Sequence, residues 1–369
     1  MVCAVFTVEL TLSWLRHHDS ARGWLALWAF VSTLLYGGHF VFFYHAYDLL
    51  PLSDTVYVGC NLAVYPLYLI YISELTDRRP ISSRLPLLAA LLSLPVVVAV
   101  MVWVAYANMM PATTERFVTT YLYEGSRDGL VGVASIQVWI HDVAHVLFGL
   151  QVLGVMVAGI SKIRRYNQRL KYVFADTEDK NLGSISVVLW LLVVTSLFSV
   201  LVNAIGRQWF EGTMLLALPS LLFSGLLFSI GWIGLSARSY VNELWSMEPV
   251  TPETEAETTT GGGGPDYQSL ARQFDQLMNN EQLYLMHDLR LDMVVQRLGT
   301  NRTYLLAALK QEMGMTFNEY VNRKRIACAR KLMDDNPDML KSDVAARSGF
   351  NSQSAFYRNL KNLGGKQQG

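Results

Sequence analysis

The sequence predicts an all-α protein: a bundle of seven transmembrane helices, followed by a soluble helical domain with two helix-turn-helix units. Three observations carry this prediction. Hydrophobic residues make up 52% of the 369 residues and charged residues only 16%, so the chain is too apolar for an entirely soluble protein. Apolar stretches long enough to cross a bilayer recur throughout residues 1–245. Charged residues are denser in residues 267–369, where the apolar positions follow helical spacing.

Seven stretches of the first 245 residues are candidates for transmembrane helices. A helix needs about 20 mostly apolar residues to cross the hydrocarbon core of a bilayer. Six stretches approach or exceed this length: residues 23–44, 56–73, 85–107, 131–160, 183–205 and 213–235. Residues 2–15 form a shorter stretch with Glu9 in its middle, and no basic segment precedes it as in a signal peptide. We expect it to be a seventh, short span.

The Lys and Arg residues between the spans predict the orientation of the bundle, because such residues are enriched on the cytoplasmic side of a membrane. One set of alternate connections holds 12 of them and the other set holds 3. The twelve are Arg16, Arg22, Arg78, Arg79, Arg84, Lys162, Arg164, Arg165, Arg169, Lys171, Lys180 and Arg238, and the three are Arg116, Arg127 and Arg207. This asymmetry predicts an external N-terminus and places the chain after residue 238 in the cytoplasm.

Polar side chains inside the spans are candidates for function, because their burial in lipid is costly. His141 and His145 share one face of a predicted helix, with Asp142 beside them and His39 in another span. Three hypotheses stay open for these residues: a sensory or ligand cavity, a metal or haem site, and hydrogen bonds that only hold helices together. The external loop 108–129 is long enough to cap such a cavity. We expect no metal and no cofactor, and the absence of lysine from every span excludes a retinal Schiff base.

A linker divides the chain into two domains. Residues 246–266 contain five acidic residues, no basic residue and four consecutive glycines, a composition typical of a flexible tether. We therefore expect a membrane domain at residues 1–245 and a separate domain at residues 267–369. The latter holds 15 Lys and Arg against 10 Asp and Glu, which gives it a net charge of +5.

Two similar helical patterns follow each other in the last domain. Each has a short helix, a turn that contains a glycine (Gly299 or Gly349) and a second helix, which is the helix-turn-helix arrangement. A long helix joins the two patterns. The predicted helices cover residues 289–298, 301–314, 317–335, 340–347 and 352–363. One such pattern is a weak signal, but two that are joined by a long helix within about 75 residues are much more specific.

A set of residues spread over both helix-turn-helix patterns and the long helix between them is characteristic. They are Gly314, Phe317, Asn318, Glu319, Tyr320, Arg325, Ile326, Ala329, Leu332, Gly349, Phe350, Phe356 and Arg358. With these residues, the stretch 289–365, about a fifth of the chain, resembles the AraC/XylS-type DNA-binding domain. The whole arrangement is similar to membrane-anchored AraC-type regulators of Bacteroidetes-like bacteria, which implies a multi-pass protein of the bacterial inner membrane with a cytoplasmic C-terminal domain.

The resemblance implies that two recognition helices on one chain enter successive major grooves of double-stranded DNA. Arg can read guanine and Gln can read adenine, whereas lysine is suited to phosphate. The residues that the resemblance places at the DNA are Asn301, Arg302, Thr303, Leu306 and Ala307 in the first unit, and Ser352, Gln353, Ser354, Arg358 and Lys361 in the second.

Two features depart from the family pattern. Leu306 and Ala307 are apolar where the family usually has polar groups, so the first recognition helix is expected either to contact thymine methyl groups or to add little specificity. The chain also ends as GGKQQG after Leu363, without the proline and closing helix that the family usually has. We therefore expect either that the second helix-turn-helix unit is less stable than usual or that the reading frame is altered at its end.

The predicted function is a one-component transcription regulator, whose membrane bundle senses a signal and whose tethered domain binds DNA. Its predicted partners are double-stranded DNA, the lipid membrane, an unidentified signal ligand and a second copy of the chain in a homodimer. A membrane transporter or enzyme with a regulatory DNA-binding-like tail is the alternative, and a bundle that serves only as an anchor is a third hypothesis. The sequence has no phosphate loop, nucleophile elbow or HExxH motif, and we expect no enzymatic activity.

Overall fold

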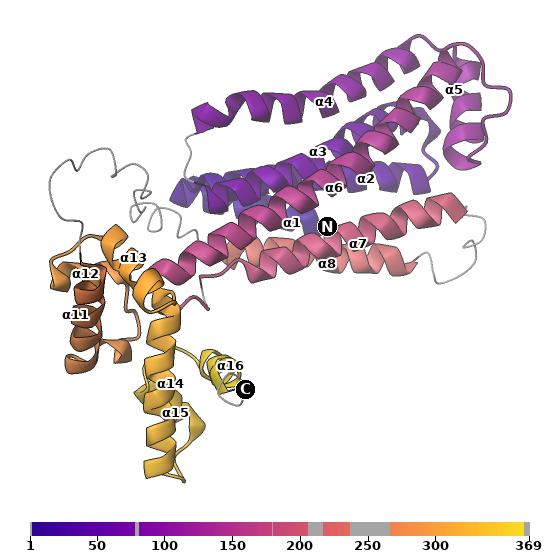
Figure 1. Ribbon diagram of the computed structural model, residues 1–369. Helices are drawn as coiled ribbons and strands as arrows, with labels where there is room; N and C mark the ends of the chain where they lie inside the picture. Colours follow the sequence, from indigo (N-terminus) through magenta and orange to yellow (C-terminus); the bar gives the residue numbers. More distant parts are fainter. Residues whose placement is uncertain (1, 78–80, 179, 206–216, 237–265, 365–369) are drawn as a thin grey trace, which may run out of the picture. The chain divides into compact units, whose positions relative to one another are not determined.

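The computed structural model describes residues 2–77, 81–178, 180–205, 217–236 and 266–364, which divide into two compact units (Figure 1). The first unit consists of Met1–Ile163 and Gly183–Arg238, and the second consists of Arg164–Leu182 and Ser239–Gly369. The second unit therefore includes residues far from the C-terminal domain in sequence. Within the described ranges, regular secondary structure is helical apart from one isolated antiparallel β-bridge between Phe174 and Arg290. The all-α prediction is confirmed for these residues.

The first unit is built from long apolar helices that pack on their neighbours in the sequence. Helix α2 packs against α1 and α3, α3 also packs against α4, and α8 packs against α7 and α1. Short helices η1, α5 and the π-helix η2 lie in the connections. The bounds are α1 Val2–His17, α2 Ser20–Phe43, η1 Tyr47–Leu49, α3 Leu50–Thr76, α4 Ile81–Ala107, α5 Pro111–Phe117, η2 Val118–Tyr123, α6 Val133–Val173, α7 Gly183–Ile205 and α8 Ala217–Ser236.

Four described helical stretches are long and apolar enough to cross a membrane: Ser20–Phe43, Tyr47–Thr76, Ala89–Ala107 and Val133–Val173. Shorter apolar helices occur at Gly183–Thr195 and Gly225–Leu235. Every predicted span overlaps a helix, including the short α1, although residues 213–216 lie outside the described ranges. The total of seven spans stays a prediction.

Helix α6 is much longer than the span predicted at residues 131–160. It has 41 residues, which at about 1.5 Å per residue corresponds to roughly 60 Å, twice the thickness of a hydrocarbon core. Its last part carries Arg164, Arg165, Arg169 and Lys171 instead of apolar residues. Arginine and lysine favour helices nearly as well as leucine does, so the helix continues where hydrophobicity ends. This basic end of α6 belongs to the second unit.

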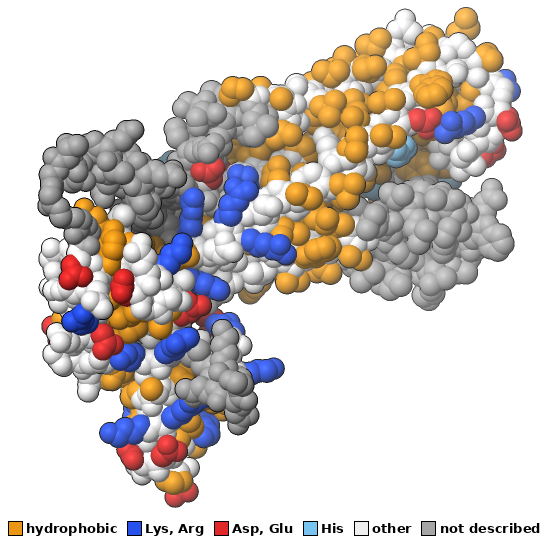
Figure 2. Space-filling view, in the orientation of Figure 1, with side chains coloured by type: hydrophobic (Ala, Val, Ile, Leu, Met, Phe, Trp, Pro, Cys, Tyr) orange, Lys and Arg blue, Asp and Glu red, His pale blue; other side chains and the backbone are white. Residues whose placement is uncertain are grey.

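Hydrophobic side chains cover much of the surface of the first unit, whereas lysine and arginine side chains are dense on the second (Figure 2). Trp139, Val146 and Val157 on α6 and Val96 on α4 are each more than 60% exposed. Exposed apolar patches of this kind are rare on soluble proteins but are normal for a surface that contacts lipid. The surface of the first unit thus fits the apolar composition of its helices.

The second unit contains the predicted helices of the C-terminal domain. Gly299 ends α12 with a left-handed φ of 62°, and Asn301 begins α13 by accepting a hydrogen bond from the Tyr304 amide at 2.8 Å. Thr316 and Glu319 form a capping box at the start of α14. The bounds are α11 Tyr267–Asn280, η5 Leu283–Leu285, α12 Leu291–Leu298, α13 Arg302–Glu312, α14 Phe317–Asp335, α15 Lys341–Arg347 and α16 Gln353–Gly364. The linker between the domains lies outside the described residues, except for Asp266.

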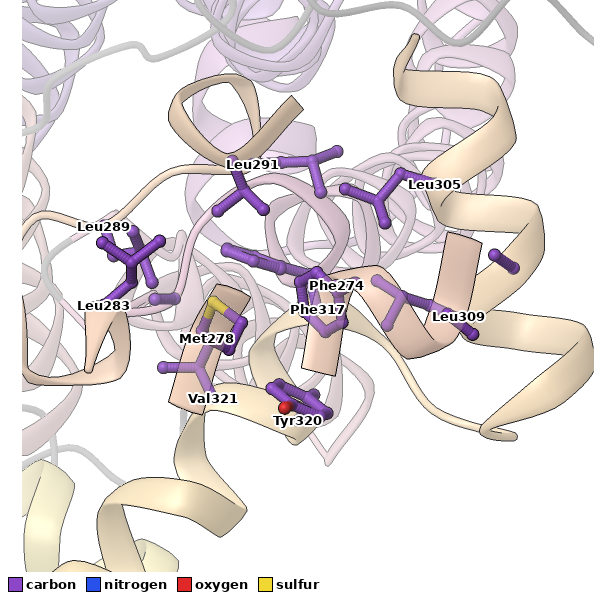
Figure 3. Packing of buried hydrophobic residues seen from close by; sticks show 14 of the residues in the cluster. Phe274, Met278, Leu283, Leu289, Leu291, Leu305, Leu309, Phe317, Tyr320 and Val321 are labelled. Carbon is purple, nitrogen blue, oxygen red and sulfur yellow. The ribbon is translucent and has the colours of Figure 1, made fainter. Parts of the chain in front are cut away.

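Two hydrophobic clusters form the cores of the two halves of the C-terminal domain. The first gathers residues of α11, α12, α13 and the start of α14 around Phe274, Leu305 and Phe317 (Figure 3). The second gathers the later part of α14, α15 and α16 around Phe350 and Phe356. Helix α14 contributes to both clusters, so it is the shared element of the two helix-turn-helix units.

Apolar spacing alone does not identify every buried position of these helices. Helical spacing of the apolar residues would place Ala327 on the buried face of α14 and Leu340 with α15, but Ala327 is exposed, and Leu340 is 68% exposed at the N-cap of α15. In their place, α14 buries the polar side chains of Asn322 and Arg325. The periodicity of apolar residues could not predict this, because it assumes that a buried position carries an apolar side chain. The three cysteines, Cys3, Cys60 and Cys328, are free.

Candidate nucleic-acid interface

The first helix-turn-helix unit consists of α12, the turn at Gly299 and α13. Among the residues predicted at the DNA, Asn301 is exposed, while Arg302, Thr303 and Ala307 are half-buried. Leu306 is half-buried as well and packs against the first hydrophobic cluster. The structure therefore groups these residues at the start of α13, with the polar ones nearest to the turn.

The second helix-turn-helix unit consists of α15, the turn at Gly349 and α16. Gln353, Ser354, Arg358 and Lys361 are exposed on α16. The side chain of Ser352 accepts a hydrogen bond from the Ala355 amide at 3.0 Å and so caps this helix. The face that carries these polar residues points away from the side on which Phe356 is buried. Recognition helices present such a polar face to base edges and phosphates.

A buried arginine connects the two helix-turn-helix units. Arg325 of α14 is fully buried, and it donates hydrogen bonds from Nε to the Tyr284 carbonyl and from Nη2 to the Met286 carbonyl, both at 2.7 Å. Burial lowers the pKa of Arg325 to about 10, and Asp176 and Asp288 oppose this shift. The side chain is therefore still charged at neutral pH. The sequence resemblance named Arg325 as a family residue but did not reveal this burial.

The glycine of the second turn lies close to the same backbone segment. Gly349 has a left-handed φ of 88°, and a Cβ atom at this position would lie 2.8 Å from the Leu285 Cα and from the Tyr284 carbonyl oxygen. Only glycine permits this approach without strain. Gly349 and Arg325 thus both fix the second helix-turn-helix unit against residues 284–286, which precede the first.

Residues that sequence reasoning missed lie at the end of α16 that carries Ser352. The Glu178 carboxylate accepts a hydrogen bond from the Ser352 hydroxyl and forms an ion pair with Arg358, with 3.3 Å between Oε1 and Nη1. Glu178 belongs to the segment that follows α6, and both partners lie within the second unit. Glu178 is 174 residues from Ser352 in the sequence, so no local pattern predicts the contact. The sequence shows only that Glu178 is one of three acidic residues, with Asp176 and Asp179, in a connection otherwise rich in Lys and Arg.

The residues predicted to form a sensory cavity have different contacts, and the cavity itself stays a prediction. His141 is buried, with its Nε2 atom 3.0 Å from Asp54 Oδ2 and its Nδ1 atom 2.8 Å from the Gln137 carbonyl oxygen. His145 is exposed, and Asp142 forms an ion pair of 3.0 Å with Arg127.

His39 has aromatic neighbours. Its ring packs edge-on against Tyr57 and stacks on Phe43. Among the described residues, no group of three or more His, Cys, Asp or Glu side chains is arranged to hold a metal ion.

A different polar cluster forms around Asp54, which the sequence analysis did not select. The Tyr106 hydroxyl donates to Asp54 Oδ2 at 2.8 Å, the same oxygen that faces His141. The segment between α4 and α6 packs against this cluster, because the rings of Phe117 and Tyr121 lie 5.8 and 5.6 Å from the His141 ring. The loop thus contacts a polar group centred on Asp54 and not on His145, and a ligand cavity beneath it stays a prediction.

The comparisons with known proteins agree with the two helix-turn-helix units of the C-terminal domain. Residues 294–366 match the family described as "Helix-turn-helix domain". The chain is similar to the uncharacterized HTH-type transcriptional regulator YtdP of Bacillus subtilis (strain 168), with 27% identity over 119 residues, which is 32% of this chain and 14% of that protein. It is also similar to the probable transcription factor PqrA of Proteus vulgaris, with 31% identity over 80 residues, which is 22% of this chain and 65% of that protein.

The chain therefore covers less than two thirds of either relative, and both similarities concern only a part of it. No solved structure matches the chain. The family match, the two relatives and the paired helix-turn-helix units agree on one conclusion. The C-terminal part of this chain is an AraC-type helix-turn-helix domain, of the kind found in DNA-binding transcription factors.

Proposed function

We propose that the chain is a membrane-anchored transcription regulator that binds specific DNA through α13 and α16 and responds to a signal received by its helical bundle. The observation that carries the proposal is the junction between the two helix-turn-helix units. Arg325 and Gly349 fix both units on α14 and residues 284–286, while Gln353, Ser354 and Arg358 remain on the exposed face of α16. A rigid pair of recognition helices is what binding to successive grooves requires.

The apolar helices support the membrane anchor. Four of them are long enough to span, and α4 and α6 expose valine and tryptophan side chains as a lipid-facing surface would. In the orientation that the basic residues predict, the end of α6 and the C-terminal domain lie in the cytoplasm, where DNA is accessible. The bundle would then be a multi-pass region of the bacterial inner membrane.

The cluster of Asp54, His141 and Tyr106 is the proposed signal site. Both ring nitrogens of His141 face oxygen acceptors, so a proton must lie between Nε2 and Asp54 in addition to the one on Nδ1. Such a shared proton makes a pair with no net charge, which suits a buried position. A small polar ligand or a change in the overlying loop could reorganise this pair. No metal or cofactor is part of the proposal.

A selection experiment tests the DNA-binding function. Fragment 267–369 is incubated with a pool of duplexes whose central 30 base pairs are randomised, and the bound duplexes are sequenced after repeated rounds. We expect enrichment of a motif with two half-sites about one helical turn apart, because one monomer carries both recognition helices. A folded fragment that enriches no motif would contradict specific DNA binding.

Reporter fusions test the membrane anchor. A reporter fused at residue 120 should be active outside the cytoplasm, and reporters fused at residues 170 and 250 should be active in the cytoplasm.

A further inference from the structure

We propose that residues 174–178, which directly follow α6, are an inhibitory segment that docks on the DNA-binding domain, covers the DNA-facing end of α16, and must leave before the domain can bind DNA fully. The inference rests on the proposed DNA-binding function. Both partners belong to the second unit, which combines Arg164–Leu182 with the C-terminal domain. We call residues 174–178 the docking segment.

The docking segment pairs with the domain through its backbone. Phe174 forms an antiparallel bridge with Arg290, and the Ala175 amide donates to the Leu289 carbonyl at 3.1 Å. The Ala175 carbonyl accepts a hydrogen bond from Asn318 Nδ2 at 2.6 Å. A backbone group that is buried needs such partners, and here the domain supplies them.

Ala175 is also part of the hydrophobic core of the C-terminal domain. Ala175 is fully buried and belongs to the first hydrophobic cluster, together with Leu289 and Phe317. Asn322, which is buried on α14, directs its Nδ2 atom at the Ala175 carbonyl oxygen from 3.5 Å. The domain thus has a site shaped for one small residue of an extended segment, and the side-chain amides of Asn318 and Asn322 acquire their acceptor when this residue is present.

The acidic residues of the docking segment complement charges of the domain. Asp176 opposes the effect of burial on the Arg325 pKa, so it acts as a counter-charge to the buried guanidinium. Glu178 then reaches α16, where its two carboxylate oxygens contact the Ser352 hydroxyl and Arg358. The Glu178 side chain is only 21% exposed. Asp176 therefore acts on Arg325, at the junction of the two helix-turn-helix units, and Glu178 contacts the recognition helix α16.

The position of Glu178 conflicts with bound DNA. Recognition helices contact base edges mainly through residues near their N-terminus, and Ser352 and Arg358 are the polar groups that Glu178 occupies at this end of α16. A carboxylate there takes the hydrogen bonds that a phosphate or a guanine would accept, and its negative charge repels the DNA backbone. The docked segment and DNA therefore compete for the same side chains.

The docking segment is continuous with α6, so a movement of this helix can release it from the domain. Phe174 follows Val173, the last residue of α6, without an intervening loop. A shift or rotation of the end of this helix must therefore displace the backbone bonds of Phe174 and Ala175 as well. The segment is thus placed where a change in a membrane helix can alter the availability of Arg358.

The test uses the full chain in lipid nanodiscs and the duplex selected with the fragment. Glu178→Gln keeps the size of the side chain but removes its charge, and Glu178→Lys repels Arg358. Glu312→Gln and Glu312→Lys are matched controls, because Glu312 is exposed at the end of α13 and contributes the same charge to the domain. We expect about fivefold tighter DNA binding for Glu178→Gln and at least tenfold for Glu178→Lys, relative to the matching Glu312 variants. Equal effects at the two positions would overturn the proposal, since net charge alone would then explain them.

Docking is measured separately, without DNA, by hydrogen exchange of the peptide that contains Ala175. The hydrogen bond from the Ala175 amide to the Leu289 carbonyl predicts slow exchange of this amide in the unmodified chain and faster exchange in Glu178→Lys. Addition of the selected duplex should also speed the exchange. If the amide exchanges as fast as in an unfolded peptide, the segment does not dock and the proposal fails, whatever the affinity for DNA.

A disulfide lock provides the opposite perturbation. Phe174→Cys with Arg290→Cys places two cysteines at a bridged pair of residues, and the oxidised and reduced forms of one protein are compared. We expect oxidation to weaken binding of the duplex at least tenfold and reduction to restore it. A locked chain that binds as tightly as the reduced one overturns the inhibitory role. If no form of the chain or fragment binds any duplex, the proposed function fails, while exchange at Ala175 still reports docking.

Discussion

The guanidinium carbon of Arg325 lies 5.7 Å from the centre of the Phe350 ring, so a charge on the long helix α14 contacts the turn of the second helix-turn-helix unit. The same side chain holds the carbonyls of Tyr284 and Met286, which precede the first unit. Arg325 is fully buried and reaches both halves of the domain. The relative placement of the two recognition helices therefore depends on one side chain whose planar shape allows several contacts at once.

Arg325→Lys is expected to destabilise the domain although the charge is kept. A lysine has a single nitrogen and cannot reproduce the forked pair of bonds to Tyr284 and Met286. One buried carbonyl would lose its partner, at a cost of about 2–3 kcal/mol. For a domain of this size the melting temperature of fragment 267–369 should fall by roughly 10 °C or more. Arg323→Lys, at an exposed position of the same helix, should change it little.

Gly349→Ala tests the close approach at the second turn. The new Cβ atom would meet the Leu285 backbone at 2.8 Å, and the left-handed φ of 88° adds strain. We expect a loss of about 3 kcal/mol or more in the free energy of unfolding, measured by urea denaturation. Gly299→Ala is the control, since φ is 62° there but no atom lies within 4 Å of the added Cβ. It should cost only about 1 kcal/mol, and equal losses would show that the approach to Leu285 is unimportant.

Asp275 predicts a dependence of stability on pH. Burial alone would raise the pKa of Asp275, but hydrogen bonds from Tyr320, Lys324 and Asn279 lower it below its usual value. A depressed pKa in the folded state means that Asp275 contributes stability above the pKa of the unfolded chain, near 4, and loses it as pH falls through the folded value. Asp275→Asn should thus lower the melting temperature at pH 7, and the difference from the parent should shrink towards pH 3. A difference that is constant with pH would contradict this assignment.

Arg358→Ala and Lys361→Ala are expected to affect DNA binding differently. Arg358 can make a bidentate contact to guanine, so its loss should cost about 1–3 kcal/mol and relax the preference at one base pair. Lys361 is suited to phosphate, so its loss should weaken binding to all sequences and lower the salt slope by about 1. Both are measured with fragment 267–369, which lacks Glu178, so that the ion pair of Arg358 does not interfere. Similar losses of specificity in the two variants would contradict these roles.

Asp54→Asn should destabilise the bundle. The substitution removes the negative partner of His141 and leaves a buried charged or unpaired ring, which costs about 3 kcal/mol or more. Thermal unfolding of the full chain in detergent should show this loss. Asp142→Asn is the matched control, because its ion pair with Arg127 is largely exposed and is worth at most about 1 kcal/mol. If both variants unfold alike, Asp54 is not the centre of a buried cluster.

The helices were largely predictable, because their signals are local. Gly299 and Asn301 sit at the boundary between α12 and α13 where the sequence placed it, and α14 runs from Phe317 to Asp335 as expected. Hydropathy located the apolar helices in the same way. It failed at the end of α6, since basic residues look like a loop to a hydropathy scale although they favour helix.

The contacts between distant residues were not predictable from a single sequence. His141 was selected because it is a polar residue in an apolar stretch, but its partner Asp54 lies 87 residues away and was not selected. Arg358 was expected to face DNA, yet the structure pairs it with Glu178. In each case the charge of one partner is visible in the sequence, whereas the pairing depends on how the chain folds back.

The pair of Glu178 and Arg358 joins two parts of one polypeptide, so inhibitor and target are always synthesised in equal numbers. The fraction of domains that is covered follows from an intramolecular equilibrium and does not change with the amount of protein in the cell. A higher level of expression should therefore raise the number of active molecules in simple proportion, without the threshold that a separate inhibitor would introduce by titration. A dose series of the full chain, read by a reporter gene, should be linear at low occupancy, with a steeper slope for Glu178→Lys.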